Sequence, residues 1–181
     1  ELVGRAVEAG ADAVKFQTFI PEYISGGDPA RCQRLKDFQL SQENFRKLAR
    51  QSAELGLIFF STPFDPNSAE FLNQIQPVFK IASSDNDYFP LIRQIAGFGK
   101  PMIVSTGLAN LELLDRVRDE INNVWSQINV NPGLALLHCV SDYPTPPEQA
   151  NLGAITSLRN RYSRLVIGYS DHTLGIQAAI S

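Results

Sequence analysis

The chain has 181 residues, of which 44% are hydrophobic, and this is enough for one domain with a real core. Its 16 Lys and Arg residues against 19 Asp and Glu residues make it mildly acidic, and the basic residues are scattered, which argues against nucleic acid as a partner. No apolar stretch approaches the roughly 20 residues that span a bilayer, and no signal-peptide pattern opens the sequence. We therefore expect a cytoplasmic protein with no membrane partner.

The first half of the chain predicts helices alternating with short strands. Ala9-Gly10 is typical of a helix end and precedes a strand at 13–16. A polar loop rich in Gly, Pro and Asp follows. Ser41 then caps a helix that stops at Gly56, before a strand at 57–60. The pair Asp65-Pro66 predicts an N-cap followed by proline in the first turn of the next helix.

The second half repeats this alternation. We expect strands at 79–82, 102–105, 134–140 and 165–169, and helices near 91–96, after Asn110 towards Trp125, and starting at 173–181. No linker or composition shift marks a second domain. The two cysteines, Cys32 and Cys139, lack metal-ligand spacing and are expected to be reduced thiols without a catalytic role.

Six βα units in a row predict an α/β fold, either an open doubly wound sheet or an incomplete TIM (β/α)8 barrel. The barrel is favoured because no Gly-rich dinucleotide motif is present and polar residues follow every predicted strand. A whole barrel usually needs about 250 residues. We therefore expect residues 1–181 to be a partial barrel that lacks the first and eighth strands.

Two lysines lie within apolar strands, Lys15 between Val14 and Phe16 and Lys80 between Phe79 and Ile81. Lysine is seldom buried without a partner, so a structural ion pair is one interpretation. The other is an anion site, which is favoured because hydroxyl groups for phosphate or carboxylate oxygens are available at Thr62, Ser83, Ser105 and Ser170.

The two histidines have different settings. His138 lies mid-strand among aliphatic residues and is expected to be a satisfied core histidine. His172 follows the last predicted strand beside Asp171, where a metal ligand is plausible, although one histidine alone does not make a metal site. Alternation along the strands places Lys15 with Gln17, Ser141 with Tyr143, and Ser170 with His172.

Six segments in order resemble the sialic acid synthase family, which includes N-acetylneuraminate synthase and its legionaminate, pseudaminate and spore-coat relatives. They are KFQT, STPFD, KIAS, GKPMIVSTG, LLHCVSDYPTP and GYSDHT. The resemblance implies a barrel enzyme, a transferase that condenses phosphoenolpyruvate with a 2-acetamido sugar such as N-acetylmannosamine and releases phosphate. The product would be a nine-carbon 2-keto acid such as N-acetylneuraminate.

The resemblance also implies roles for individual residues. Gln17 and Tyr143 would face the sugar, and His172 would be one of two histidines on a Mn²⁺ or Mg²⁺ ion. The residues expected to hold phosphoenolpyruvate are Lys15, Thr62, Lys80, Ser83, Ser105, Ser141 and Ser170. Lysines and fixed hydroxyls suit this ligand because it carries a carboxylate and a phosphate on adjacent atoms.

Asp85 is the candidate for the catalytic carboxylate that handles protons, together with Lys15 and Lys80 in the catalytic set. The neuraminate-forming members commonly have glutamate here, so the shorter aspartate indicates either a compensating neighbour or another sugar. The family's small C-terminal antifreeze-like domain and its second metal histidine are not expected within residues 1–181. The chain by itself is therefore expected to be inactive, and the complete protein to be a homodimer.

Two other functions remain open. A noncatalytic phosphate- or sugar-binding barrel is favoured only by Asp85. Another aldol-type synthase that uses phosphoenolpyruvate, such as the 3-deoxy-heptulosonate phosphate synthases, would share the chemistry. The HCVSDYPTP and SDHT segments argue against it.

Overall fold

A computed structural model describes residues 1–181, and the chain divides into two units, Glu1–Lys80 and Ile81–Ser181. Helices alternate with strands along both units, and the strands that pair do so in parallel. The predicted α/β class with parallel sheets is confirmed.

The first unit contains a sheet of two strands, β1 (Ala13–Thr18) and β2 (Ile58–Pro63). In their parallel register Lys15 lies opposite Phe60, and Gln17 lies opposite Thr62. Because paired residues of parallel strands point to the same side, these four residues share one face of the sheet. The helices of this unit are α1 (Leu2–Glu8), α2 (Pro21–Ile24), α3 (Pro29–Phe38), α4 (Gln42–Glu54) and α5 (Pro66–Asn73).

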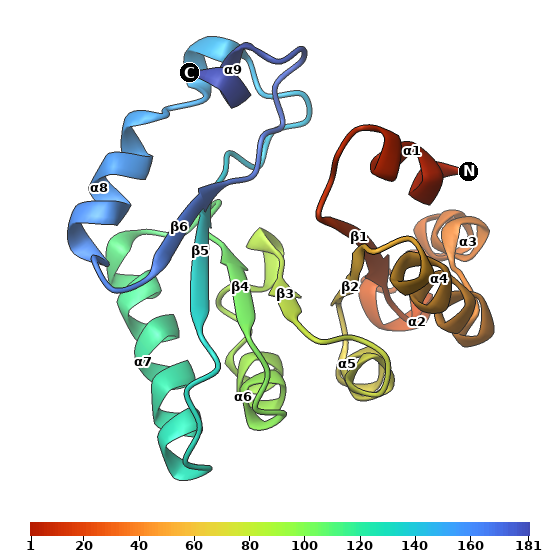
Figure 1. Ribbon diagram of the computed structural model, residues 1–181. Coiled ribbons are helices and arrows are strands. Elements are labelled where there is room, and N and C mark those ends of the chain that lie inside the picture. The colour runs from red at the N-terminus through yellow and green to blue at the C-terminus, as the bar shows by residue number, and fades with distance from the viewer. The chain divides into compact units, whose positions relative to one another are not determined.

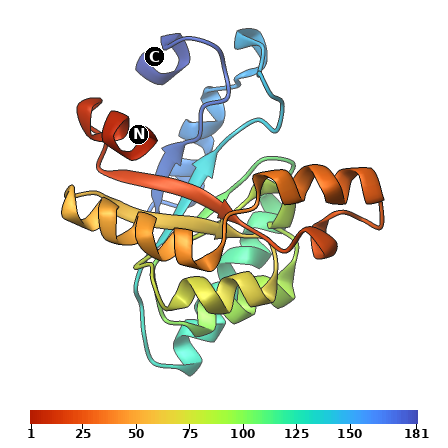
Figure 2. The same cartoon turned by 90° about the vertical axis from the view of Figure 1, so that its right-hand side faces the viewer.

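An aromatic cluster forms the core on the other face of this sheet. Phe16 of β1 stacks on Phe59 of β2 with ring centroids 5.5 Å apart, and meets Phe45 of α4 edge-on at 6.4 Å. Phe71 of α5 lies 6.2 Å from Phe45. Figure 2 shows α4 running alongside the two strands, in the position that these contacts require. The helices therefore cover one face and leave Lys15 and Gln17 on the other.

The second sheet has the strand order β3-β4-β5-β6 (Figure 1). Its strands are β3 (Phe79–Ile81), which spans the boundary between the units, β4 (Met102–Ser105), β5 (Leu134–His138) and β6 (Val166–Tyr169). A doubly wound sheet reverses its strand order at a switch point, whereas this order follows the sequence throughout. The sequential order is the one that a βα barrel has.

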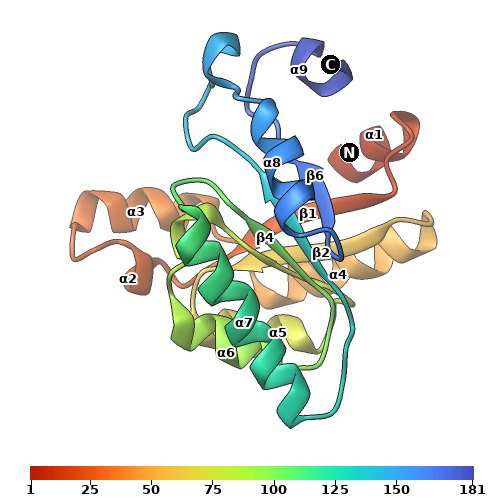
Figure 3. The ribbon, with the colours of Figure 1, turned by 90° about the vertical axis from the view of Figure 1, so that its left-hand side faces the viewer.

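Helices α6 (Phe89–Gly97) and α7 (Leu111–Gln127) pack side by side in this unit (Figure 3). Each buries four apolar residues spaced along one stripe: Leu91, Ile92, Ile95 and Ala96 on α6, and Leu114, Val117, Ile121 and Trp125 on α7. Helix α8 (Gly153–Arg161) packs against β5 and β6, and the short α9 (Gln177–Ile180) ends the chain. Two 3-10 turns, Ser83–Asp85 and Pro147–Gln149, follow β3 and β5.

The predicted strands are observed within one to three residues of their expected ends, and both predicted N-caps, Ser41 and Asp65, are confirmed, with Asn110 as a third N-cap where a helix was expected to begin. Ser41, Asp65 and Asn110 each accept a hydrogen bond from the backbone N–H three residues later. Gly56, with a φ of 76°, follows the end of α4 as expected.

Three predictions of secondary structure were wrong or incomplete. The polar loop before Ser41 contains α2 and α3, and α3 begins with an Asp28 cap and Pro29, the same signal that was recognised at Asp65-Pro66. Helix α8 was not predicted, because Leu158 is its only buried residue and gives little periodicity. The helix expected from residue 173 is confined to α9, since Thr173 forms an isolated bridge with Thr145.

Of the two Asp-Pro caps, Asp65 is the buried one and also accepts a hydrogen bond from outside its own helix. It is 2% exposed, and its carboxylate accepts hydrogen bonds from the backbone N–H of Ile20, the backbone N–H of Ser68 and the Ser68 hydroxyl. We expect Asp65→Ala to lower the free energy of unfolding by about 2–4 kcal/mol, because it removes a cap and leaves a buried N–H unpaired. The exposed cap Asp28 is the matched control, and Asp28→Ala should cost about 1 kcal/mol. Equal losses in urea denaturation would contradict the role assigned to the buried carboxylate.

Candidate active site

Three predicted site residues share one face of the first sheet. Lys15 and Gln17 of β1 lie beside Thr62 of β2 on the face away from the aromatic core. Thr62 is 1% exposed, and its Oγ1 is buried without a hydrogen-bond partner. A buried hydroxyl of this kind is costly unless a ligand completes its hydrogen bonding, so Thr62 is suited to contact an oxygen-rich ligand.

The two lysines differ in their surroundings. Lys80 is buried, with 8% of its surface exposed, as predicted. Lys15 is exposed, contrary to the expected burial, because β1 pairs with β2 alone and its outer face is open. Partial desolvation still lowers the pKa of the Lys15 ammonium, and no carboxylate forms an ion pair with it. A structural ion pair therefore does not explain Lys15.

Two predicted hydroxyls and a thiol converge on Gly107 in the second unit. Ser83 follows β3, and Cys139 and Ser141 follow β5. The Ser83 Oγ lies 3.0 Å from the Cys139 Sγ, whereas the Ser141 Oγ is buried and has no partner. Gly107 follows β4 and lies against all three side-chain heteroatoms. Residues that follow three successive strands thus form one polar cluster.

Asp85 lies at the end of the 3-10 turn that begins with Ser83. Burial is the main reason that its pKa is raised to about 6, with a smaller contribution from the negative charge of Asp87. A hydrogen bond from Ser84 opposes the shift, and the Asp85 Oδ2 has no partner. A carboxyl group with a pKa near 6 can both donate and accept a proton close to neutral pH.

Asn86 anchors this turn to the end of β4. It is 3% exposed, and its Nδ2 donates to the carbonyl oxygens of Ser105 at 3.2 Å and Gly107 at 2.9 Å. Ser105 is itself buried, with 2% exposed. The amide of Asn86 therefore fixes the backbone on which the polar cluster is built.

His172 lies beside Ser170 and Tyr143 in the loops that follow β6 and β5. Its Nδ1 lies 2.7 Å from the Val140 carbonyl oxygen, and its Nε2 lies 3.4 Å from the Ser170 Oγ. The Tyr143 ring centroid is 4.3 Å from that of His172, although 70% of Tyr143 is exposed. Because a carbonyl can only accept, the Nδ1 carries the proton and the Nε2 presents a lone pair.

His138 is a core residue, as predicted. It is 6% exposed, its Nε2 lies 2.8 Å from the Ala150 carbonyl oxygen, and its ring stacks on Tyr169. No group of three His, Cys, Asp or Glu side chains is arranged to hold a metal ion, so His172 is a single potential ligand.

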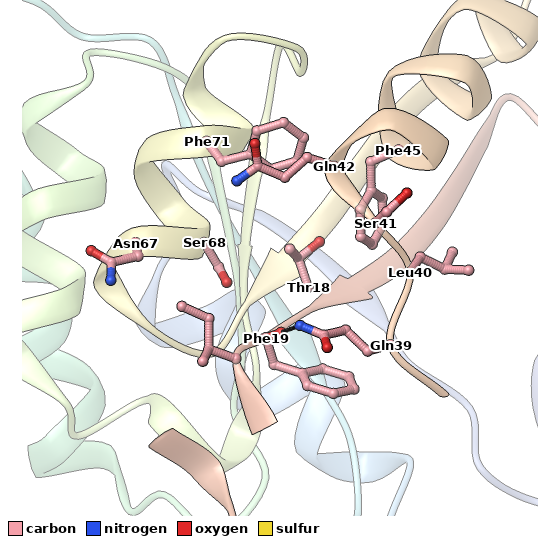
Figure 4. Close-up of a pocket in the computed structure, with 11 residues that line it drawn as sticks. Thr18, Phe19, Gln39, Leu40, Ser41, Gln42, Phe45, Asn67, Ser68 and Phe71 are labelled. Carbon is pink, nitrogen blue, oxygen red and sulfur yellow. Dashed lines mark hydrogen bonds between the residues drawn. The ribbon is translucent and has the colours of Figure 1, made fainter. Parts of the chain in front are cut away.

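Two cavities lie near these elements, one in each unit. A cavity of about 340 Å³ is lined by Thr18, Ser41, Phe45, Asn67 and other residues of the first unit (Figure 4). It contains none of the predicted site residues, because Thr18 points to the helix-covered face of β1. A cavity of about 650 Å³ in the second unit includes Cys139 and Ser141 in its lining and so borders the polar cluster.

The structure thus groups the predicted residues, apart from Lys80 and Ser105, into three sets. Lys15, Gln17 and Thr62 share a sheet face. Ser83 and Ser141 meet at Gly107, and Ser83 begins the 3-10 turn that ends at Asp85. Ser170, His172 and Tyr143 form the third set. Asn86, Gly107 and Cys139 were not predicted to be parts of the cluster. For Gly107, its place in the segment Ser105-Thr106-Gly107 was a signal in the sequence that could have indicated a role.

These observations define a class of protein: an α/β protein of repeated βα units in which polar side chains gather beyond the strand ends. A comparison of the sequence with protein families narrows this class, because residues 2–181 match the NeuB family. The chain belongs to the NeuB family.

Several named relatives are synthases of acidic sugars. The chain is 36% identical to the N,N'-diacetyllegionaminic acid synthase of Legionella pneumophila over 97% of its length and 53% of that protein. It is 31% identical to the N-acetylneuraminate-9-phosphate synthase of Drosophila melanogaster over 99% of its length and 52% of that protein. These names support sugar-acid synthesis at the level of the family.

A solved structure supports the same relationship. The N-acetylneuraminic acid synthetase of Leptospira borgpetersenii, crystallised with citrate, superposes with a TM-score of 0.89 at 32% identity. The match covers 97% of this chain and 59% of that one. The chain spans about half the length of the curated relatives it matches. None of its helices is both long enough and apolar enough to span a membrane.

The raised pKa of Asp85 predicts a pH dependence of stability. Ionisation of Asp85 is harder in the folded than in the unfolded protein, so its contribution to stability is fully present below the unfolded pKa of about 3.8 and is lost as pH rises through about 6. Asp85→Asn stays neutral at every pH. Its free energy of unfolding should therefore rise relative to wild type by roughly 1 kcal/mol between pH 5 and pH 8. A stability difference in urea denaturation that is constant over this range would contradict the raised pKa.

Proposed function

We propose that the full-length protein condenses phosphoenolpyruvate with a 2-acetamido sugar, such as N-acetylmannosamine, to give a nine-carbon 2-keto acid, such as N-acetylneuraminate, and phosphate. The observation that carries this proposal is the polar cluster around Gly107, where the Ser141 hydroxyl is buried without a partner in a NeuB-family chain. Buried hydroxyls with unused hydrogen-bonding capacity are suited to hold the oxygens of an anion.

The proposed phosphoenolpyruvate ligands are the two lysines and five hydroxyl residues. Lys15 and Lys80 would neutralise the carboxylate and phosphate, and the hydroxyls would orient them. The hydroxyls are those of Thr62, Ser83, Ser105, Ser141 and Ser170, of which Thr62 and Ser141 have unpartnered oxygens. Burial of Lys80 supports a strong interaction with an anion, because a low-dielectric setting strengthens Coulomb attraction.

Gln17 and Tyr143 are proposed to contact the sugar. Both are exposed, so they are accessible to a second substrate that approaches bound phosphoenolpyruvate. In the reaction, C3 of phosphoenolpyruvate forms a bond to the aldehyde carbon of the open-chain sugar. Water then adds at C2, and phosphate leaves from the tetrahedral carbon.

Asp85 is proposed to move protons in these steps. The attacking water loses a proton, and the new alkoxide on the sugar gains one. Asp85, with a pKa raised to about 6, is ionised in part at neutral pH and can take a proton from water and return it. Its carboxylate form would also favour the positive charge that develops at C2.

A Mn²⁺ or Mg²⁺ ion is proposed as the cofactor, with His172 as one of its ligands. One residue of this chain fits such an ion, because the hydrogen bond of the His172 Nδ1 to the Val140 carbonyl fixes the tautomer with the lone pair on the Nε2, which faces the Ser170 Oγ at 3.4 Å. When bound, the ion would supply Lewis-acid polarisation of the sugar aldehyde. The nearby Ser170 hydroxyl is proposed to contact phosphoenolpyruvate and not the metal ion.

The assembly is also part of the proposal. We propose that the six βα units belong to an eight-unit barrel, which the sequential strand order and the likeness to the Leptospira synthetase support. We further propose a cytoplasmic homodimer.

The experiment that tests the function measures phosphate release from phosphoenolpyruvate by the full-length protein with Mn²⁺, with and without each of a panel of 2-acetamido sugars. Release that depends on the sugar, with a nine-carbon keto acid in mass spectrometry, is the expected result. A chelator should abolish turnover and added Mn²⁺ should restore it. If phosphoenolpyruvate binds but no phosphate is released with any sugar, the noncatalytic barrel would be favoured instead. Asp85 is the residue that suggests this alternative.

Lys80 allows the anion site to be tested without turnover. Lys80→Ala should weaken phosphoenolpyruvate binding at least 100-fold in calorimetry, since it removes a buried positive charge. Lys47→Ala is the control, because Lys47 pairs with Glu43 on the surface of α4 and its loss should leave affinity unchanged. Unchanged affinity in a folded Lys80→Ala protein would overturn the anion-site assignment.

A further inference from the structure

Gly107 is buried just after β4, and its surroundings leave no room for a side chain. A Cβ atom at this position would overlap the Ser141 Oγ, and would lie 2.7 Å from the Ser83 Oγ and 3.1 Å from the Cys139 Sγ. Its φ is outside the left-handed region, so the backbone itself does not call for glycine. The space above the Gly107 α-carbon is therefore needed by the three neighbouring side chains.

Those neighbours cannot easily move away. The Ser83 Oγ is held by the Cys139 Sγ at 3.0 Å, and Cys139 is 5% exposed. The Gly107 carbonyl accepts a hydrogen bond from the buried Asn86 amide, which holds the backbone in place. An added methyl group would therefore push on hydroxyls whose surroundings are already packed.

We propose that Gly107 is a positioning residue for phosphoenolpyruvate, which allows the Ser83 and Ser141 hydroxyls to converge on one ligand oxygen. This inference rests on the proposed function. A side chain at position 107 would separate the two hydroxyls and misalign them. Preorganised donors lose their advantage when they are displaced by a fraction of an ångström.

The first test compares two glycine variants of the full-length protein. Gly107→Ala should weaken phosphoenolpyruvate binding tenfold or more in calorimetry and raise the KM for phosphoenolpyruvate, with the KM for the sugar within twofold of wild type. Gly97→Ala is the matched control, because Gly97 also lacks a positive φ and a Cβ there would meet nothing within 4 Å. Its affinity should be unchanged.

A double-mutant cycle tests the steric mechanism. Ser141→Ala removes the oxygen that the new Cβ would overlap, so Gly107→Ala should cost clearly less affinity in the Ser141→Ala background than in wild type. A loss that does not arise from the contact with the Ser141 oxygen would be the same in both backgrounds. If Gly107→Ala alone does not fold, the double variant should fold, and the remaining 2.7 Å contact with the Ser83 Oγ should keep its affinity below that of Ser141→Ala.

The outcomes separate the inference from the function on which it rests. Wild-type protein that binds no phosphoenolpyruvate would overturn the proposed function, and the positioning role with it. Wild-type binding together with equal affinity of folded Gly107→Ala, or with equal losses in the two backgrounds of the cycle, would overturn the positioning role alone.

Discussion

The parallel register of β4, β5 and β6 is the constraint on which the polar cluster depends. Ser105 lies opposite Leu137, and His138 lies opposite Tyr169, so neighbouring strands end nearly level with one another. The residues that come next in the chain must then leave the sheet at the same edge. This register alone brings Cys139 and Ser141, which follow β5, next to Gly107, which follows β4. The helices that follow β3 and β4, α6 and α7, bury stripes of apolar residues and supply the core, so these loop residues do not have to fill it.

Collecting polar groups at this edge has a cost in stability. The Ser141 Oγ and the Asp85 Oδ2 are buried without partners, and each such group costs about 1–3 kcal/mol. Stripes of buried apolar residues on α6 and α7 offset this, because a fully buried aliphatic side chain contributes about 1.5–3 kcal/mol. Unsatisfied groups are expected at functional sites, where a ligand completes the hydrogen bonding. The residues of the polar cluster thus lower the stability of the fold, and the apolar stripes of α6 and α7 compensate for this loss.

Much of the fold could be predicted from the sequence because its signals are local. Ser41, Asp65 and Asn110 mark helix starts through bonds to residues three positions later, and short apolar runs mark strands. Helix α3 was missed because none of its residues is buried and it shows no apolar stripe. Gly107 and Asn86 could not be assigned roles, since their neighbours are 19 to 34 residues away in sequence and meet them only in the fold. Lys15 looked buried from its apolar neighbours, yet those neighbours face the helices while Lys15 faces outward.

Most residues proposed for phosphoenolpyruvate are buried or half-buried, with the exposed Lys15 as the exception, whereas both residues proposed for the sugar are exposed. Lys80, Thr62 and Ser105 are buried, and such positions are fixed by packing whatever the second substrate is. Tyr143 is exposed and Gln17 is exposed, so the groups proposed for the sugar are not held by this chain's core. Under the proposed function, exposed contact residues would let members of the family differ in their sugar while the buried residues stay in place. The relatives fit this pattern, since they are named for neuraminic, legionaminic and pseudaminic acids. Under the same proposal Asp85 would move protons, and it is also the position whose shorter side chain was expected to indicate either a compensating neighbour or another sugar.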